Sequence, residues 1–169
     1  VLSQPIDYFP NCEYAPGCDE NGDTSAELLS EVRTAAEKSE ACVVFVGLPD
    51  SLESEGFDRM DMSIPQGHID MLLAAAEVNP NTVAVLLSGS AVECPWADKV
   101  RSVLYMGLPG QAGAEAIAEL LFGRAVPSGK LAESWPYSYE DVPSSEIFGK
   151  TRDALYEEGL YVGYRYYDK

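Results

Sequence analysis

Residues 41–48 read ACVVFVGL, and this apolar run is the segment that decides the fold of the chain. Its length is typical of a β-strand, and its apolar residues are continuous instead of alternating with polar ones. A strand that is apolar on both sides is buried on both faces, which is usual in a parallel sheet. We therefore expect a parallel β-sheet that is covered by helices.

Helices are predicted before and after this strand. Thr24 or Ser25 is a typical helix cap, and the residues that follow place four apolar side chains on one helical face: Leu28, Leu29, Val32 and Ala36. Pro65 is suited to the start of a second helix, which ends at Asn79-Pro80-Asn81. The buried face of this second helix is expected to hold Ile69, Leu72, Leu73 and Ala76.

Two further strands are predicted at residues 82–87 and 102–106, and a third helix at 112–121 is closed by Gly123. Strands and helices that alternate with short connections predict one domain, over residues 1–169. The expected fold class is α/β, a three-layer α/β/α sandwich around a mostly parallel sheet in a flavodoxin-like arrangement.

The last part of the chain has a weaker pattern. Residues 131–135 are a candidate edge strand, and residues 137–160 look like a long excursion. Residues 161–167 are aromatic and alternating, which is typical of a packing strand at a domain boundary. The same tyrosines could instead stack on sugar rings.

The chain is acidic, since its 169 residues carry a net charge of −17 at pH 7 and a sequence pI of about 4.2. Hydrophobic residues make up 46% and charged residues 23%, which is typical of a globular domain. Because an acidic surface repels phosphate backbones and anionic lipids, we expect neither nucleic acid nor a membrane as partner. No apolar run approaches the roughly 20 residues that span a bilayer, and no signal peptide is recognised, so a cytoplasmic location is expected over secretion.

The cysteines are Cys12, Cys18, Cys42 and Cys94, and the one histidine is His68. No C-x-x-C pair occurs, so we expect no metal site, and we expect no cofactor. A Cys12–Cys18 disulfide is the alternative to the free thiols that a reducing cytoplasm favours. His68 lies in the first turn of the second predicted helix, where a lone histidine is more often structural than catalytic.

The loop after the first strand carries the strongest candidates for catalysis, and it reads LESEGFDR at residues 52–59. Ligands of open parallel sheets meet the protein outside the carboxyl ends of the strands. Glu55 is the leading candidate for a general acid/base, and Glu53 is the fallback. A general acid must stay protonated until it reacts, which apolar surroundings such as the adjacent Phe57 favour. The alternative is an acidic surface loop in an acidic protein.

Other motifs predict structure. Asp58 and Arg59 can hold the loop in shape through charge-assisted hydrogen bonds, or they can form a solvated ion pair. The stretch Gly107–Gly113 matches neither a Walker A loop nor a GxGxxG pattern, and we interpret it as tight strand-to-helix packing. Ser128-Gly129-Lys130 follows a helix instead of preceding one, so it is not a phosphate-binding loop. Ser88-Gly89-Ser90 lacks the G-x-S-x-G frame, so it is not a nucleophile elbow.

Eight segments in order are shared with one family. They are residues 43–48, 53–59, 79–83, 92–96, 110–113, 121–123, 127–131 and 158–167, which read VVFVGL, ESEGFDR, NPNTV, VECPW, GQAG, LFG, PSGKL and EGLYVGYRYY. Together they resemble the second, α/β-sandwich domain of family 3 glycoside hydrolases, in the β-glucosidase branch. The resemblance runs from about Tyr14 to the end of the chain.

The resemblance implies a domain of a retaining glycosidase that hydrolyses terminal, non-reducing β-D-glucosyl units. It implies that Glu55, in the Glu-Gly-aromatic-Asp-Arg pattern, is the acid/base residue, with Phe57 a candidate substrate contact and Asp58 and Arg59 supporting the loop. The family's nucleophile is an aspartate in a Ser-Asp-Trp type motif of a preceding TIM-like barrel, and no Ser-Asp-Trp occurs here. The resemblance therefore implies an excised domain, without the catalytic barrel and a following fibronectin-like domain, that is inactive by itself.

Two other functions stay open on the residues alone. A doubly wound α/β domain could bind a nucleotide or a flavin, although a phosphate loop is missing. A non-catalytic module for packing would leave Glu55 as an ordinary surface residue.

Overall fold

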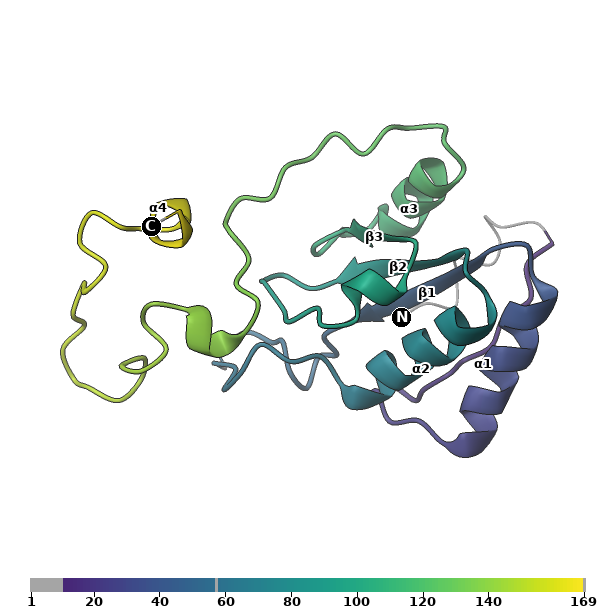
Figure 1. Cartoon of the computed structure of the whole chain (residues 1–169), viewed down its shortest axis with the longest axis horizontal. Coiled ribbons are helices and arrows are strands. Elements are labelled where there is room, and N and C mark those ends of the chain that lie inside the picture. Colours follow the sequence, from purple (N-terminus) through teal and green to yellow (C-terminus); the bar gives the residue numbers. More distant parts are fainter. Residues whose placement is uncertain (1–10, 57, 169) are drawn as a thin grey trace.

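The computed structural model describes residues 11–56 and 58–168. Three strands form one parallel sheet in the order β1-β2-β3, at the centre of the fold (Figure 1). The strands are β1 (Cys42–Gly47), β2 (Thr82–Leu87) and β3 (Ser102–Tyr105), and a 3-10 helix η2 (Ala97–Lys99) leads into β3. Each strand lies inside the range that the sequence predicts for it.

Helices cover the sheet from two sides (Figure 1). α1 (Ala26–Lys38) packs on α2 (Gln66–Val78), and α2 packs on β1 and β2. α3 (Gly113–Leu121) lies on the other side of the sheet. The predicted three-layer α/β/α sandwich around a parallel sheet is confirmed. Among the described residues, no helix is both long and apolar enough to cross a membrane.

The helix ends follow local signals in the sequence. Ser25 caps α1, because its Oγ accepts a hydrogen bond from the Leu28 N–H at 3.3 Å. Pro65 takes the cap position of α2, one residue before the helix begins. Gly123 follows the last turn of α3 with a φ of +68°, a left-handed conformation that ends the helix as predicted.

The main core lies between the sheet and α2. Its largest fully buried side chain is that of Trp96, which precedes η2. Around it are buried residues of β1, β2 and α2, among them Val44, Val46, Ala84, Leu86, Leu72 and Ala75. Removing these side chains from water is the dominant favourable term in folding.

The opposite face of the sheet is covered only in part, which differs from the expectation that residues 41–48 are buried on both faces. Val85 in the central strand is fully buried, whereas Val43 of β1 is 36% exposed and Phe45 is half-buried. The reason is the length of α3, which has nine residues and buries Ile117 and Ala118. Among the described residues, this face is covered by one short helix next to β3, and the β1 side is less covered (Figure 1).

Residues 124–168 form an arm that leaves α3, passes back along the sheet as far as η3 and then runs outward to α4 (Figure 1). The arm contains a 3-10 helix η3 (Tyr139–Asp141) and a short helix α4 (Tyr164–Tyr167). The predicted edge strand at 131–135 is wrong, since these residues pair with no strand. Trp135 instead packs its ring edge-on against Tyr105 of β3, with 5.1 Å between ring centroids.

The predicted strand at residues 161–167 is also wrong. Gly163 has a φ of +60° and turns the chain into the single helical turn of α4. In that turn the rings of Tyr166 and Tyr167 meet edge-on at 5.3 Å, so neighbouring aromatic residues contact each other. The aromatic residues at this end of the chain therefore contact each other locally, within a helical turn, and form no strand.

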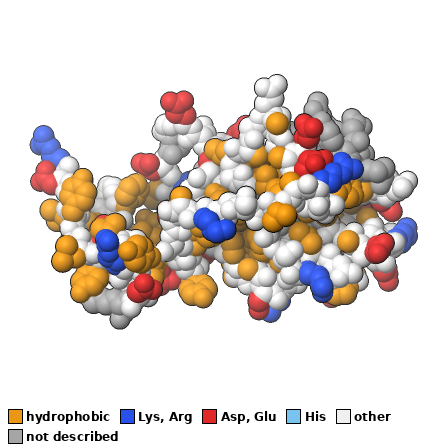
Figure 2. All heavy atoms as spheres, turned by 90° about the horizontal axis from the view of Figure 1, so that it is seen from above, with side chains coloured by type: hydrophobic (Ala, Val, Ile, Leu, Met, Phe, Trp, Pro, Cys, Tyr) orange, Lys and Arg blue, Asp and Glu red, His pale blue; other side chains and the backbone are white. Residues whose placement is uncertain are grey.

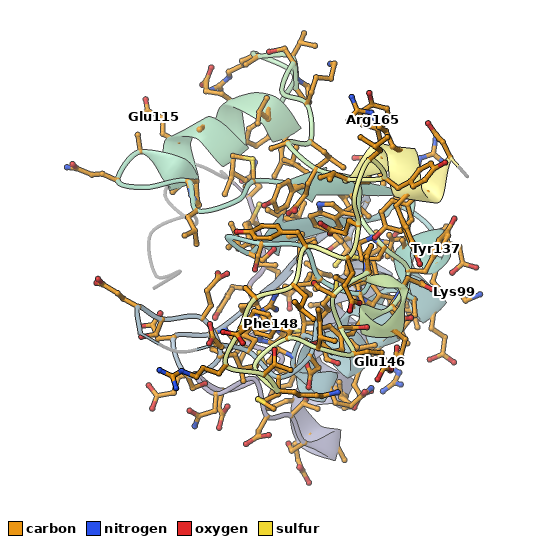
Figure 3. The ribbon with its side chains drawn as sticks, turned by 90° about the vertical axis from the view of Figure 1, so that its left-hand side faces the viewer. Lys99, Glu115, Tyr137, Glu146, Phe148 and Arg165 are labelled. Atoms are coloured by element: carbon orange, nitrogen blue, oxygen red, sulfur yellow. The ribbon has the colours of Figure 1, made fainter. Side chains whose placement is uncertain are left out.

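The arm carries apolar side chains that the sandwich leaves uncovered. Figure 2 shows hydrophobic side chains gathered at the end of the arm. Along the arm, Tyr137 is 96% and Tyr156 is 90% exposed. Figure 3 looks onto this end and shows the side chains of Tyr137, Glu146 and Phe148 on the arm.

Replacing Leu72 by Ala tests the core between α2 and the sheet. Leu72 is fully buried, so we expect Leu72→Ala to lower the free energy of unfolding by about 2–5 kcal/mol. The prediction that the adjacent Leu73 is buried is wrong, since it is 37% exposed. Leu73→Ala is therefore the matched control and is expected to cost clearly less. Urea unfolding followed by circular dichroism measures both, and equal losses would contradict the assigned core.

Candidate active site

Two connections meet at one edge of the sheet. The loop 48–59 leaves the end of β1, and the turn 88–91 leaves the end of β2. Gly47 pairs with Leu87 in parallel register, so both connections start side by side. The Leu48 N–H extends the pairing with a hydrogen bond of 3.0 Å to the Leu87 carbonyl. This edge is where open parallel sheets hold their ligands.

Glu53 is bound to the turn 88–91. Its two carboxylate oxygens accept hydrogen bonds from the Gly89 N–H at 2.8 and 3.0 Å. The Ser90 hydroxyl lies 3.3 Å from the same carboxylate and donates to it. A carboxylate held by a backbone N–H forms the shorter, stronger class of hydrogen bond, so the half-buried Glu53 side chain has one defined position.

Glu55 is in a different situation, although it is only two residues away. Its side chain is exposed, and it makes no hydrogen bond or ion pair with the residues that the structure describes. Gly56 follows with a φ of +86°, and no atom lies within 4 Å of the position that a Cβ would take. Phe57, the predicted substrate contact, lies outside the described residues. The loop thus offers the Glu55 carboxylate to solvent.

Arg59 returns the loop to the same turn. One guanidinium nitrogen, Nη2, donates to the Ser90 hydroxyl at 2.9 Å and to the Ala91 carbonyl at 3.0 Å. The other, Nη1, is buried and has no partner in the described part of the chain. Asp58 is exposed, and no ion pair between it and Arg59 is found among the described residues. The loop is therefore held through Arg59 and not through an Asp-Arg pair.

The turn 88–91 is itself braced. Ser88 is fully buried, and its hydroxyl donates to the Ser90 carbonyl at 2.9 Å. The Tyr105 hydroxyl, at the end of β3, donates to the Ser88 carbonyl at 2.9 Å. Sequence reasoning missed both braces and the role of this turn as a partner of the loop. The signal that could have found the turn is its place directly after a strand parallel to β1.

His68 holds the start of the loop. It lies in the first turn of α2, and its Nδ1 is 3.0 Å from the Gly47 carbonyl and 3.3 Å from the Gly47 nitrogen. The imidazole is half-buried, and burial withholds from its charged form the hydration that would stabilise it. The pKa of His68 is therefore lowered below its ordinary value of 6.5. Its contacts are those of a structural histidine, because they end on the backbone of β1.

The remaining motifs carry no cluster of ligands. The Gly107–Gly113 stretch leaves the end of β3 at the same edge and passes into α3. A Cβ on Gly113 would come within 2.8 Å of the Pro109 ring, as tight strand-to-helix packing requires. All four cysteines are free thiols, and burial raises the pKa of the Cys94 thiol to about 11. Within residues 11–56 and 58–168, no three His, Cys, Asp or Glu side chains are placed to hold a metal ion.

The fold and the loop at its edge define the class of the protein. Residues 7–164 match the model of the glycosyl hydrolase family 3 C-terminal domain. This chain belongs to that family.

Individual relatives agree with this family. The chain is 53% identical over 150 residues to the thermostable β-glucosidase B of Acetivibrio thermocellus, a match that covers 88% of this chain and 20% of the relative. It is 40% identical over 161 residues to an exo-α-(1→6)-L-arabinopyranosidase of Bifidobacterium breve, covering 92% of this chain and 21% of that enzyme. The chain thus spans about a fifth of the length of these relatives.

Solved structures also match most of this chain and about a fifth of their own length. The family 3 β-glucosidase of Bifidobacterium adolescentis superposes with a TM-score of 0.85 at 40% identity, over 91% of this chain and 23% of that one. The β-glucosidase of Kluyveromyces marxianus, solved in complex with glucose, gives a TM-score of 0.79 at 36% identity, over 84% of this chain and 17% of that one.

The His68 contact predicts a pH dependence of stability. Its pKa is lowered in the folded state, so below the unfolded value of about 6.5 the unfolded chain binds the proton first. The contribution of His68 to the free energy of unfolding is then expected to be complete above pH of about 6.5 and to be lost as the pH falls from there through the lowered pKa of the folded state. His68→Asn removes the titrating group, so its unfolding free energy should fall less over this range. Identical pH slopes for the two proteins would contradict the structural role of His68.

Proposed function

We propose that this chain is the acid/base-bearing domain of a retaining β-glucosidase that hydrolyses terminal, non-reducing β-D-glucosyl units, with Glu55 as the acid/base. Membership of the family supports a glycosidase. The β-glucosyl substrate follows the relatives and structures that carry the name β-glucosidase, although the relative from Bifidobacterium breve is an arabinopyranosidase.

One observation carries the choice of Glu55 over Glu53. An acid/base residue must reach the glycosidic oxygen and then a water molecule, so its carboxyl group has to be free. Glu53 gives both of its oxygens to the Gly89 N–H. Glu55 stands exposed on the same loop with no partner among the described residues.

The proposed mechanism has two displacement steps. In the first, an aspartate attacks the anomeric carbon while Glu55 gives its proton to the leaving oxygen. In the second, Glu55 takes a proton from a water molecule, whose oxygen attacks the anomeric carbon and releases the aspartate. Glu55 is protonated again at the end, so one carboxyl group serves as acid and then as base. The two carboxyl groups should lie about 5–5.5 Å apart in the assembled site.

The nucleophile is proposed to come from a TIM-like barrel in the same polypeptide, and a fibronectin-like domain to follow this one. This chain spans about a fifth of its relatives' length, which leaves room for both. The sugar is proposed to bind between the loop and the barrel, because Glu55 and the nucleophilic aspartate must reach the same glycosidic bond.

Replacing Glu55 by Ala in the full-length protein tests the acid/base assignment. Without a proton donor, kcat/KM for glucosides with poor leaving groups should fall by roughly 10²–10⁴-fold, and far less for activated aryl glucosides. Azide should restore turnover of activated substrates and yield β-glucosyl azide, because a small anion can enter where the carboxylate was. Steady-state kinetics and product analysis measure both effects.

The matched control is Glu37→Ala, which removes an exposed glutamate from α1. It should leave kcat/KM unchanged for every substrate. Full activity of Glu55→Ala on substrates with poor leaving groups would rule out Glu55 as the acid/base.

The isolated chain of residues 1–169 is expected to show no hydrolysis of aryl β-glucosides. Double displacement requires two carboxylates in one site, and the chain is proposed to supply only one. Release of nitrophenol by the purified chain, above a Glu55→Ala version of it, would contradict the two-domain site.

A further inference from the structure

We propose that Glu53 is a positioning residue, whose carboxylate clamps the loop that carries Glu55 onto the turn 88–91. This inference rests on the proposed function, in which Glu55 is the acid/base. It gives Glu53 a part in the reaction without contact with the sugar.

The loop is clamped from both ends. Glu53 holds the Gly89 N–H and the Ser90 hydroxyl, and Arg59 holds the Ser90 hydroxyl and the Ala91 carbonyl. The two clamps therefore meet on Ser90. Glu55 therefore lies in the sequence between two charged side chains that are fixed to one turn.

The turn is shaped to admit the Glu53 carboxylate. A Cβ on Gly89 would lie 3.0 Å from the Glu53 Oε1 and 3.0 Å from the Leu108 Cδ1. Contacts of 3.0 Å are tighter than most Cβ contacts, so with a side chain at position 89 the Glu53 carboxylate or Leu108 would have to shift by a few tenths of an ångström. Glycine at this position leaves the Glu53 carboxylate room against the backbone N–H.

The anchor is rigid because the sheet supports it. The Ser88 hydroxyl and the Tyr105 hydroxyl hold the backbone of the turn from inside, each with a hydrogen bond of 2.9 Å. Ser88 is fully buried. A clamp onto this turn therefore fixes the loop relative to β2 and β3, and not only to another loop.

Glu55 depends on these clamps because it has no contact of its own in the described residues. The position of its carboxylate relative to the sugar follows from where residues 53 and 59 are held. A displacement of about 1 Å at a reacting group can cost roughly 10²-fold in rate. Loss of the Glu53 clamp should therefore weaken proton transfer by Glu55 while the Glu55 carboxyl group is still present.

The experiment compares Glu53→Ala, Glu53→Gln and Glu55→Ala in the full-length protein, using aryl β-glucosides with a series of leaving groups. We expect Glu53→Ala to lower kcat/KM by roughly 10–100-fold for poor leaving groups and much less for activated ones, because proton donation is what suffers. Azide should produce no β-glucosyl azide, since the Glu55 carboxylate still fills its place. Glu53→Gln should recover part of the loss, because its amide oxygen can accept the Gly89 N–H.

Two further variants separate positioning from folding. Gly89→Ala keeps Glu53 but crowds its carboxylate, so it should reproduce the leaving-group dependence of Glu53→Ala. Asp19→Ala is the matched control, because Asp19 Oδ1 also accepts two backbone N–H groups, those of Asn21 and Asp23, both at 2.9 Å. In Asp19→Ala, the dependence of kcat/KM on the leaving group should be the same as in the unmodified protein. Circular dichroism and thermal unfolding report on folding, and if Glu53→Ala does not fold, Glu53→Gln and Gly89→Ala decide.

The outcomes are distinguishable. Unchanged kcat/KM in folded Glu53→Ala, or an equal loss for all leaving groups, would overturn the positioning role and leave the Glu55 assignment intact. β-Glucosyl azide formed by Glu53→Ala and not by Glu55→Ala would overturn both, since Glu53 would then be the acid/base. Full activity of Glu55→Ala on poor leaving groups would overturn the proposed function and, with it, this inference.

Discussion

The parallel pairing of β1 with β2 is the constraint on which the rest of the structure depends. Gly47 and Leu87 are partners at the last rung of this ladder, and the two backbones approach so closely that a Cβ on Gly47 would collide with the Leu87 carbonyl. Because parallel strands end at the same edge, the loop after β1 and the turn after β2 emerge together. The hydrogen bonds between the loop and the turn, from the Glu53 carboxylate to the Arg59 guanidinium, follow from this one adjacency.

Glu53 and Glu55 have the same side chain, and the roles proposed for them differ because their surroundings differ. The chain carries a net charge of −17, so an additional exposed carboxylate is unremarkable by composition. Glu53 faces a turn that offers it an N–H and a hydroxyl, whereas Glu55 faces solvent. One is thereby suited to hold the loop and the other to act on a substrate, which is how environment separates the roles of paired acids.

Local signals predicted most of the sandwich. β2 has the predicted bounds, α1 begins after the predicted cap at Ser25, and Gly123 ends α3, because capping and apolar periodicity act within a few residues. The strands expected at 131–135 and 161–167 were wrong, because a strand needs a partner and no local pattern supplies one. The contact of Glu53 with Gly89 joins residues 36 apart in the sequence, so it depends on strand order and register, which the pattern of the loop does not contain.

The sequence by itself determined the class of fold, the family and the loop that carries the two glutamates. These properties reside in hydrophobic periodicity, helix caps and the order of short motifs, all of which can be read along the chain. Only the tertiary structure decided which glutamate is bound and which is free, and which turn braces the loop. Those distinctions depend on hydrogen bonds between segments that the parallel sheet brings together, and such distances exist only once β1, β2 and β3 lie side by side.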